Sequence, residues 1–273
     1  MTDIGSRDLD REIEKDGRAI ARDHLRPGDV AVVTGCARGF GRAIARRLAR
    51  GGARLALWDV IDGEGEDTAA LCREAGAEAE FFRCDMGEVA AIREGAGAVL
   101  ERFGPVYALI NNAGIHPRAA SLEVTPETWN RTLAVNLTGA FFCAQAFAPA
   151  MIERSRGVII NLASGRAIEG APNGIHYAAS KAGIIAMTKT LATEWARHGI
   201  RVNAIIPGVS ETRQPLEAGG TLEALRERGR EIPLGRVGHP DDIAGMVALL
   251  LSEDAAYITG QGLAINGGRI MLP

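Results

Sequence analysis

Short apolar runs alternate along the chain with longer segments in which apolar residues recur every three or four positions. The short runs are typical of strands buried on both faces, and the periodic segments are typical of helices packed on a sheet. We predict strands near residues 29–34, 54–58, 79–84, 106–110, 157–162, 200–205 and 262–265. We predict helices near residues 40–51, 63–75, 88–103, 126–154, 174–198 and 240–251.

Strands that alternate with helices form βαβ units, whose strands lie parallel in one sheet. The expected fold class is therefore α/β, with a doubly wound, predominantly parallel sheet of seven strands and helices on both faces. The chain has 273 residues, of which 47% are hydrophobic. This length suffices for a single large domain, which we place at residues 28–273. The helix at 126–154 is expected to begin with Thr125 as its cap and Pro126 in its first turn.

Two segments depart from this alternation. Residues 1–27 are dense in charge and have few apolar positions, so we predict an N-terminal extension that is partly helical or disordered. Residues at about 208–235 follow a predicted strand and include Pro215 and the pair Gly219-Gly220. This segment is expected to be a loop over the substrate, and an ordinary surface loop is the alternative.

A glycine-rich segment, Thr34 to Gly41, joins the first predicted strand to the first predicted helix. This arrangement is typical of a site for the pyrophosphate of a dinucleotide. Glycine allows close approach of the backbone, and the helix N-terminus offers free N–H groups. A tight turn that needs glycine only for its own backbone is the alternative.

The second predicted strand ends at Asp59. An acidic residue about twenty positions past such a turn usually receives the hydroxyls of the adenosine ribose. A carboxylate repels a 2′-phosphate, so Asp59 favours NAD over NADP. Arg38, inside the turn, argues for NADP because a guanidinium pairs with a 2′-phosphate. An ordinary loop Asp at a strand end is the alternative to the ribose role.

Tyr177 and Lys181 are four residues apart in the predicted helix at 174–198, so they lie on one face about one turn apart. A free phenol has a pKa of about 10, and a neighbouring ammonium lowers it by favouring the phenolate. Such a Tyr exchanges a proton with an alcohol or a carbonyl, which is general acid–base chemistry. Ser164 lies thirteen residues before Tyr177, directly after a predicted strand. A strand-end hydroxyl without a function is the alternative for Ser164.

Together these residues resemble the short-chain dehydrogenase/reductase family, in the common form that has Asp at the end of the second strand and prefers NAD. The family's Thr-Gly-x-x-x-Gly-x-Gly motif matches Thr34 to Gly41, and its Asn-Asn-Ala-Gly motif matches Asn111 to Gly114. The resemblance implies a Rossmann-type fold and the catalytic residues Asn136, Ser164, Tyr177 and Lys181. It implies that the cofactor is bound by Gly35, Arg38, Gly39, Phe40, Gly41, Asp59, Val60, Asp85, Met86, Asn112, Ala113, Gly114, Tyr177, Lys181, Pro207, Gly208, Val209 and Thr212.

The resemblance also implies a role for each catalytic residue. Tyr177 transfers the proton, Ser164 hydrogen-bonds the substrate oxygen, and Lys181 binds the nicotinamide ribose. Asn136 holds a water that relays the proton to solvent, and an Asn that bonds only its own backbone is the alternative. Asn111 is expected to line the cofactor.

Further basic residues lie close to these motifs in the sequence. His176 precedes Tyr177, but adjacent helix residues face different directions, so packing is favoured over a substrate contact. Arg118, Arg166 and Arg213 are expected on the surface, and binding of an acidic substrate is the alternative.

Composition narrows the partners and the compartment. The net charge of −3 gives no reason to expect binding to nucleic acid or to an acidic membrane surface. No uninterrupted apolar run is long enough to span a bilayer, and the N-terminus lacks the apolar core of a cleaved signal. The four Cys and five His lack metal-ligand spacing, so no metal is expected. Scattered thiols suit a reducing cytoplasm.

The expected function is NAD-dependent interconversion of a secondary alcohol and a ketone by hydride transfer. NADPH-dependent reduction of 3-oxoacyl groups on acyl-carrier protein is the alternative, which Arg38 supports and Asp59 opposes. A non-catalytic dinucleotide-binding regulator usually lacks part of the catalytic tetrad, and a scaffold without cofactor is a further alternative. The resemblance implies a homotetramer in which the helices at 126–154 and 174–198 pack against other copies. Burial within one subunit is the alternative.

Overall fold

The structure is a computed structural model that describes residues 28–212 and 221–271. The expected N-terminal extension at 1–27 lies outside the described residues. So do Arg213 and the rest of segment 213–220 within the expected substrate loop.

Seven parallel strands form one sheet in the order β3-β2-β1-β4-β5-β6-β7. The strands are β1 (Val30–Thr34), β2 (Arg54–Asp59), β3 (Ala79–Arg83), β4 (Val106–Asn111), β5 (Gly157–Leu162), β6 (Ile200–Pro207) and β7 (Gly262–Ile265). All seven were predicted, and their ends lie within two residues of the expected positions. The predicted doubly wound α/β fold is confirmed.

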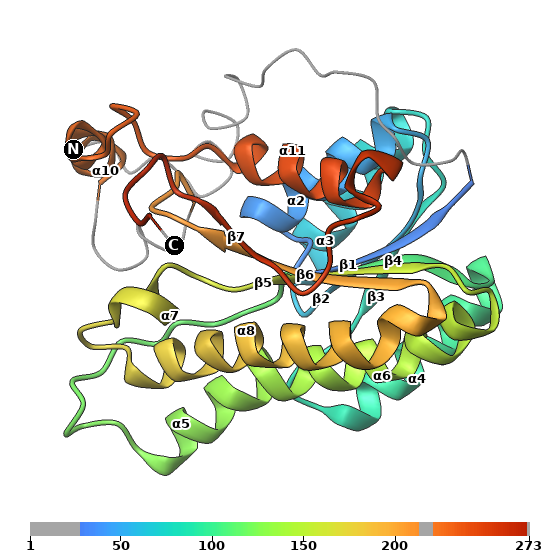
Figure 1. The fold of residues 1–273 in the computed structure, drawn as a ribbon, viewed down its shortest axis with the longest axis horizontal. Helices are drawn as coiled ribbons and strands as arrows, with labels where there is room; N and C mark the ends of the chain where they lie inside the picture. Colours follow the sequence, from blue (N-terminus) through green and yellow to red (C-terminus); the bar gives the residue numbers. More distant parts are fainter. Residues whose placement is uncertain (1–27, 213–220, 272–273) are drawn as a thin grey trace.

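Two layers of helices cover the sheet (Figure 1). One layer holds α2 (Gly39–Arg50), α3 (Asp62–Glu74) and α11 (Pro240–Leu251). The other holds α4 (Val89–Phe103), α5 (Pro126–Leu133), α6 (Gly139–Glu153) and α8 (Ile175–Trp195). Two short helices, α7 (Arg166–Glu169) and α10 (Leu222–Glu227), lie outside these layers toward the carboxyl ends of the strands (Figure 1).

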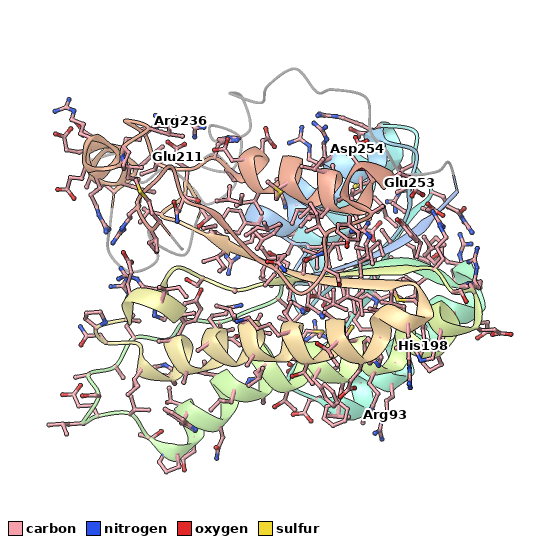
Figure 2. The ribbon with its side chains drawn as sticks, in the orientation of Figure 1. Arg93, His198, Glu211, Arg236, Glu253 and Asp254 are labelled. Carbon is pink, nitrogen blue, oxygen red and sulfur yellow. The ribbon has the colours of Figure 1, made fainter. Side chains whose placement is uncertain are left out.

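The helices present apolar residues to the sheet and polar residues to solvent. In α4, Ile92 is fully buried, whereas its neighbour Arg93 is exposed and projects from the outer surface (Figure 2). The Arg93 guanidinium carbon lies 5.8 Å from the ring centroid of Phe142 in α6. The aliphatic and cationic parts of this side chain thus cover apolar surface that the helix leaves open.

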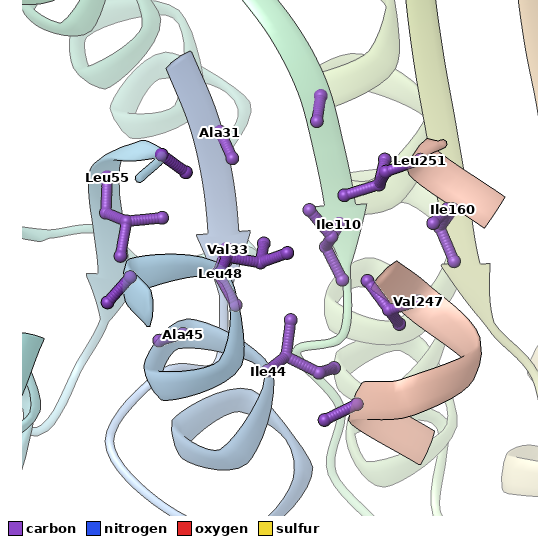
Figure 3. Packing of buried hydrophobic residues seen from close by; sticks show 14 of the residues in the cluster. Ala31, Val33, Ile44, Ala45, Leu48, Leu55, Ile110, Ile160, Val247 and Leu251 are labelled. Atoms are coloured by element: carbon purple, nitrogen blue, oxygen red, sulfur yellow. The ribbon is translucent and has the colours of Figure 1, made fainter. Parts of the chain in front are cut away.

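Apolar side chains fill both spaces between sheet and helices. Val33 and Ile110 belong to one fully buried cluster with Ile44 of α2 (Figure 3). Val32 and Leu109, their neighbours along the strands, belong to the cluster on the other face. Successive strand residues point to opposite faces, and both faces are covered. This is why the strands appear in the sequence as continuous apolar runs.

The predicted helix at 126–154 is confirmed as one helical run, Pro126–Glu153, but it is not α-helical throughout. The segment Ala134–Thr138 forms a π-helical turn between α5 and α6. Its residue Asn136 directs its side-chain amide to the backbone of Ile115 rather than to solvent. A π turn carries more residues than an α turn and often marks a functional position. The predicted start is confirmed, because the hydroxyl of Thr125 accepts a hydrogen bond from the third residue of α5.

Among the described residues, one helical run, Pro126–Glu153, is long and apolar enough by length and composition to cross a membrane. The run is not uninterrupted in the sense of the sequence prediction, because polar residues such as Asn136 and Gln145 lie within it. Half of its most apolar window is buried inside the protein. Within this run, α6 packs against β4, β5 and α4, so packing in the core accounts for much of the apolar composition.

The strand order places the functional edge of the sheet. The chain winds outward from β1 to β3 on one side and from β4 to β7 on the other. Ligands of such sheets bind outside the carboxyl ends of the strands, where the order reverses. The candidate site therefore lies where β1 and β4 end.

Candidate active site

The glycine-rich turn between β1 and α2 closes tightly. Gly35 has a φ of 68° and donates its N–H to Trp58 O at 2.7 Å. A Cβ atom at Gly41 would overlap the carbonyl oxygen of Gly35, so glycine is required there. Arg38, the N-cap residue of α2, makes no side-chain capping bond, and the first turn contains no acidic residue. The positive end of the helix dipole is thus available to an anion.

Asn112 braces this turn against the end of β4. Its Nδ2 donates to Thr34 O and to Gly35 O, both at 2.9 Å. In return, Thr34 Oγ1 accepts from Asn112 N at 3.0 Å and from Ala113 N at 3.1 Å. The predicted cofactor residues Asn112 and Ala113 therefore lie directly beside the turn. Gly114 is the next residue, and because it has no side chain it leaves space for side chains from α8.

Both carboxylate oxygens of Asp59 accept hydrogen bonds at the same turn. Oδ2 accepts from Ala37 N at 2.9 Å. Oδ1 accepts from Val60 N at 2.8 Å and from Ile61 N at 3.1 Å. The Val60 side chain beside it is 43% exposed. Three donors thus hold the predicted ribose partner at the edge of the glycine-rich turn.

Asp85, one of the predicted cofactor residues, is paired with Arg131, which the sequence analysis did not identify. Arg131 Nη2 lies 2.9 and 2.8 Å from the two carboxylate oxygens of Asp85. Gly87 N also donates to Asp85 Oδ1 at 2.8 Å. The next residue, Met86, is buried, and its carbonyl oxygen leaves no room for a side chain at Gly139. The pair joins residues 46 apart in sequence, so no local motif indicated it.

Ser164, Tyr177 and Lys181 lie around the end of β5, as the sequence predicted. Ser164 Oγ accepts a hydrogen bond from Arg166 N at 3.2 Å. Tyr177, in the first turn of α8, is 7% exposed. Lys181 lies one turn later; its Nζ donates to Leu162 O at 2.7 Å and lies 5.8 Å from the centroid of the Tyr177 ring. The ammonium is therefore held close to the phenol by the strand itself.

Asn136 reaches the same place from the π turn. Its Oδ1 accepts from Ile115 N at 2.8 Å, and its Nδ2 donates to Ile115 O at 2.9 Å and to Ser180 Oγ at 3.1 Å. Ser180 Oγ donates in turn to Tyr177 O at 2.7 Å. Both Asn136 Oδ1 and Lys181 Nζ lie within 3.4 Å of where a Gly114 Cβ would be. Asn136, Tyr177 and Lys181 thus belong to one connected region, and Ser164 lies two residues after the Leu162 carbonyl that holds Lys181.

The side chain of Asn111, which was expected to line the cofactor, is directed into the protein. Its amide Nδ2 donates to Ala140 O at 3.2 Å and to Asn161 Oδ1 at 2.9 Å, inside the protein. The last residue of a buried strand points into the adjacent helical layer here. Asn111 therefore braces β4 against β5 and α6.

The segment after β6 closes the other side of the site. Gly208 N donates to Ile265 O at 2.9 Å, and the preceding Pro207 O accepts from Gly165 N at 3.1 Å, next to Ser164. Thr212 lies against the turn, with its Cγ2 3.7 Å from the Cβ position of Gly39. The remaining two predicted contacts, Phe40 and Val209, have partly buried side chains that pack on apolar clusters.

One residue beside Tyr177 was given no individual role in the sequence analysis. The imidazole of His116 stacks on the Tyr177 ring, with centroids 4.0 Å apart and planes inclined by 16°. His176, which the sequence placed away from the chemistry, is fully buried, and its Nε2 lies 2.9 Å from Pro117 O. The available signal for His116 was its position two residues after Gly114, on the loop that leaves the carboxyl end of β4.

The cysteines and acidic residues offer no other chemistry here. All four thiols are free and buried, and burial raises the pKa of each. They are therefore poor nucleophiles. Within the described ranges, no group of three or more His, Cys, Asp or Glu side chains is arranged to hold a metal ion.

Comparison with known proteins gives the family. The family model described as Enoyl-(Acyl carrier protein) reductase matches residues 35–269. The D-threitol dehydrogenase of Mycolicibacterium smegmatis is 40% identical over 245 residues, which cover 88% of this chain and 92% of that protein. The chain belongs to the short-chain dehydrogenase/reductase family. It is an oxidoreductase that acts on CH–OH groups with a nicotinamide dinucleotide.

Other members of the family differ widely in what they act on. A 3-oxoacyl-[acyl-carrier-protein] reductase of Thermotoga maritima is 36% identical over 252 residues, covering 89% of this chain and 98% of that protein. The crystal structure of a levodione reductase superposes with a TM-score of 0.84 at 34% identity, covering 90% of this chain and 98% of that one. Proteins named for D-threitol, 3-oxoacyl groups and levodione thus share this fold, and the reaction type is better defined than the substrate.

The described residues fit such a cofactor. The N-terminus of α2 is open, and the turn before it has glycines at positions where a Cβ would overlap its neighbours; both features suit a pyrophosphate. The carboxylate of Asp59 lies beside this turn, where it would accept a hydrogen bond from a ribose hydroxyl. Lys181 and Gly114 lie together on the other side of Asn112, near Tyr177. This short-chain dehydrogenase/reductase thus retains both halves of a dinucleotide site.

The burial of Lys181 should make the free energy of unfolding depend on pH. Burial lowers the pKa of Lys181 from its ordinary 10.5 to about 8. Between these values the unfolded chain binds more protons than the folded chain, so stability rises with pH. We expect wild type to gain about 2–3 kcal/mol in unfolding free energy relative to Lys181→Met between about pH 7.5 and about pH 10.5. Urea denaturation of both proteins across this range measures the difference.

Lys189→Met is the matched control, because Lys189 lies on the same helix but is exposed. Its stability difference from wild type should stay constant across the same pH range. If the unfolding free energies of wild type and Lys181→Met changed with pH in the same way, the Lys181 ammonium would not be desolvated in the folded protein.

Proposed function

We propose that this enzyme is an NAD-dependent dehydrogenase that interconverts a secondary alcohol and a ketone, with Tyr177 as the general acid and base. One observation carries the proposal. Tyr177 and Lys181 lie one turn apart at the end of β5, and Ser164 and Asn136 lie in the same region. These side chains come from three separate elements, and the packing of the sheet brings them together.

Each residue has a proposed part in the reaction. The bound nicotinamide ring accepts a hydride from the alcohol carbon or returns it to the ketone. Tyr177 takes the hydroxyl proton during oxidation and returns it during reduction. Ser164 donates a hydrogen bond to the substrate oxygen, where negative charge develops. Lys181 favours the phenolate through its charge and binds the nicotinamide ribose.

Asn136 has a proposed part in proton exchange with solvent. Its amide is already committed to the Ile115 backbone and to Ser180, so it fixes the backbone beside Lys181. A water held beside this backbone would carry the proton between Lys181 and solvent. The role proposed for Asn136 is thus to shape a water site.

Asp59 is the basis for proposing NAD. Its carboxylate is oriented at the glycine-rich turn by three backbone N–H groups. A ribose 2′-hydroxyl is able to donate to this carboxylate, whereas a 2′-phosphate would be repelled by it. Titration of the purified protein with NAD and NADP, followed by melting temperature, tests the choice. NAD should raise the melting temperature at lower concentration than NADP, and the reverse order would overturn the choice.

NADPH-dependent reduction of 3-oxoacyl groups is the second candidate. Arg38 in the turn and the 36% identity to a 3-oxoacyl-[acyl-carrier-protein] reductase support it. Turnover of a secondary alcohol panel with NAD favours the first candidate, and turnover of a 3-oxoacyl thioester with NADPH alone favours the second. Cofactor binding without any turnover would instead support a regulatory protein.

We further propose a cytoplasmic homotetramer. Free, buried cysteines suit a reducing compartment. In α8, Ile185 and Met187 are only partly covered within the subunit, which leaves apolar surface for contact with another copy. Analytical ultracentrifugation tests the assembly, and a monomer at micromolar concentration would contradict it.

A further inference from the structure

The imidazole ring of His116 lies flat against the ring of Tyr177. The two rings are nearly parallel, with 16° between their planes and 4.0 Å between their centroids. Tyr177 is 7% exposed, so the imidazole occupies much of the space into which the phenol ring would otherwise turn. Aromatic contacts of this kind restrict ring orientation as well as burying area.

Two hydrogen-bond contacts hold the loop of His116 against the start of α8. His176 Nε2 lies 2.9 Å from Pro117 O, and Ala119 N donates to Asn173 O at 3.1 Å. His116 Nε2 itself is enclosed near Gly174 without a hydrogen-bond partner. Because the preceding residue, Ile115, is bonded to Asn136, the backbone is held on both sides of His116.

Gly174 has no side chain because the imidazole takes that space. A Cβ built on Gly174 would overlap His116 Nε2 and lie 3.3 Å from His116 Cδ2. The φ of Gly174 is −161°, an extended conformation that any residue adopts. Alanine at this position is thus prevented by the His116 ring and not by backbone strain.

The imidazole of His116 is uncharged at neutral pH. Burial is the main cause that lowers the pKa of His116, to about 4, and the charges of Arg118, His176, Arg166 and Lys181 act in the same direction. These groups come from its own loop, from α7 and from α8. A neutral imidazole provides a flat surface and adds no charge to the phenol.

We propose that His116 is a positioning residue, whose stacked ring holds the phenol of Tyr177 in the orientation that proton transfer requires. The inference rests on the proposed function, because it assigns proton transfer to Tyr177. Proton transfer depends steeply on geometry, and small displacements of a reacting group lower the rate greatly. The proposed cofactor contacts do not include His116, so the affinity for NAD should not depend on it.

Three substitutions separate stacking from other roles. His116→Ala removes the ring and should lower kcat about tenfold to thirtyfold, with the Kd for NAD changed less than about twofold. His116→Phe restores a flat ring without nitrogen atoms and should recover kcat to within about threefold of wild type. The pH profile of kcat should keep its shape in His116→Phe, because no charge on His116 takes part.

Gly174→Ala tests the same contact from the other side. It should lower kcat about tenfold, because the new methyl group displaces the imidazole from Tyr177. In the His116→Ala background the overlap with the imidazole is gone and only Ala171 Cβ, at 3.3 Å, remains close, so adding Gly174→Ala should lower kcat by less than about twofold further. This loss of additivity is what a role exerted through His116 predicts. Additive losses would show that Gly174 acts by another route and would overturn the proposal.

The outcomes distinguish this inference from the proposed function. His198→Ala is the matched control, since His198 lies at the far end of α8 (Figure 2) and its loss should leave kcat unchanged. If wild type shows no turnover with NAD, the proposed function fails. If wild type is active but His116→Phe is as slow as His116→Ala, stacking is not the role, and only this inference fails. A changed pH profile in His116→Phe would equally overturn it.

Discussion

Replacing Tyr177 with Phe should lower kcat for alcohol oxidation by about a thousandfold while leaving the Kd for NAD nearly unchanged. The substitution removes one oxygen atom and keeps the ring, so His116 still stacks on it and Lys181 still lies beside it. What is lost is the group that takes the substrate proton. Steady-state kinetics with a secondary alcohol and calorimetric titration with NAD measure the two quantities on the same preparation.

Tyr107→Phe is the matched control for this experiment. Tyr107 is also largely buried, and its hydroxyl donates to Leu251 O at 2.7 Å, far from the site in sequence and in the fold. Its loss should cost about 1 kcal/mol of stability and leave kcat unchanged. A Tyr177→Phe enzyme that keeps most of the wild-type rate would show that another group transfers the proton.

Replacing Asp59 with Asn should reduce the preference for NAD over NADP by about a hundredfold. The amide keeps an oxygen for the N–H groups of Val60 and Ile61, so the start of α3 stays in place. The negative charge that would face a 2′-phosphate is lost, and a close pair of charges near a protein surface is worth a few kcal/mol. The ratio of kcat/KM with each cofactor measures the change.

A nearby carboxylate provides the control. Asp62 lies at the start of α3, is well exposed and pairs with Arg83 at 2.7 Å. Asp62→Asn removes the same charge three residues away and should leave the ratio within about twofold of wild type. If Asp59→Asn leaves the ratio unchanged as well, Asp59 does not meet the ribose and the choice of NAD loses its basis.

Much of the site followed from the sequence because parallel strands all end at one edge of a sheet. Thr34, Asn112 and Ser164 each follow a predicted strand, so their common location was expected before any coordinate was known. The spacing of Tyr177 and Lys181 is a helical spacing and predicts a shared face. These inferences need only the period of the apolar pattern and the direction of the chain.

Other parts of the site depend on contacts between distant segments. Arg131 meets Asp85 only because α5 packs at the end of β3. Asn111 follows the pattern of a cofactor residue, yet the direction of its side chain turns its amide toward Asn161. His116 reaches Tyr177 because its loop docks on α8. No spacing rule connects residues that meet through such packing.

By itself, the order of apolar runs, glycines and a few polar residues determined the sheet, its direction and the edge where chemistry occurs, because these depend on local periodicity and on the right-handed winding of βαβ units. Only the tertiary structure decided what surrounds the reactive phenol. The orientation of Tyr177 depends on the π turn at Asn136, the Leu162 carbonyl that holds Lys181, and the space that Gly174 leaves for His116. Each is a distance between atoms from separate elements, which close packing sets and local sequence does not.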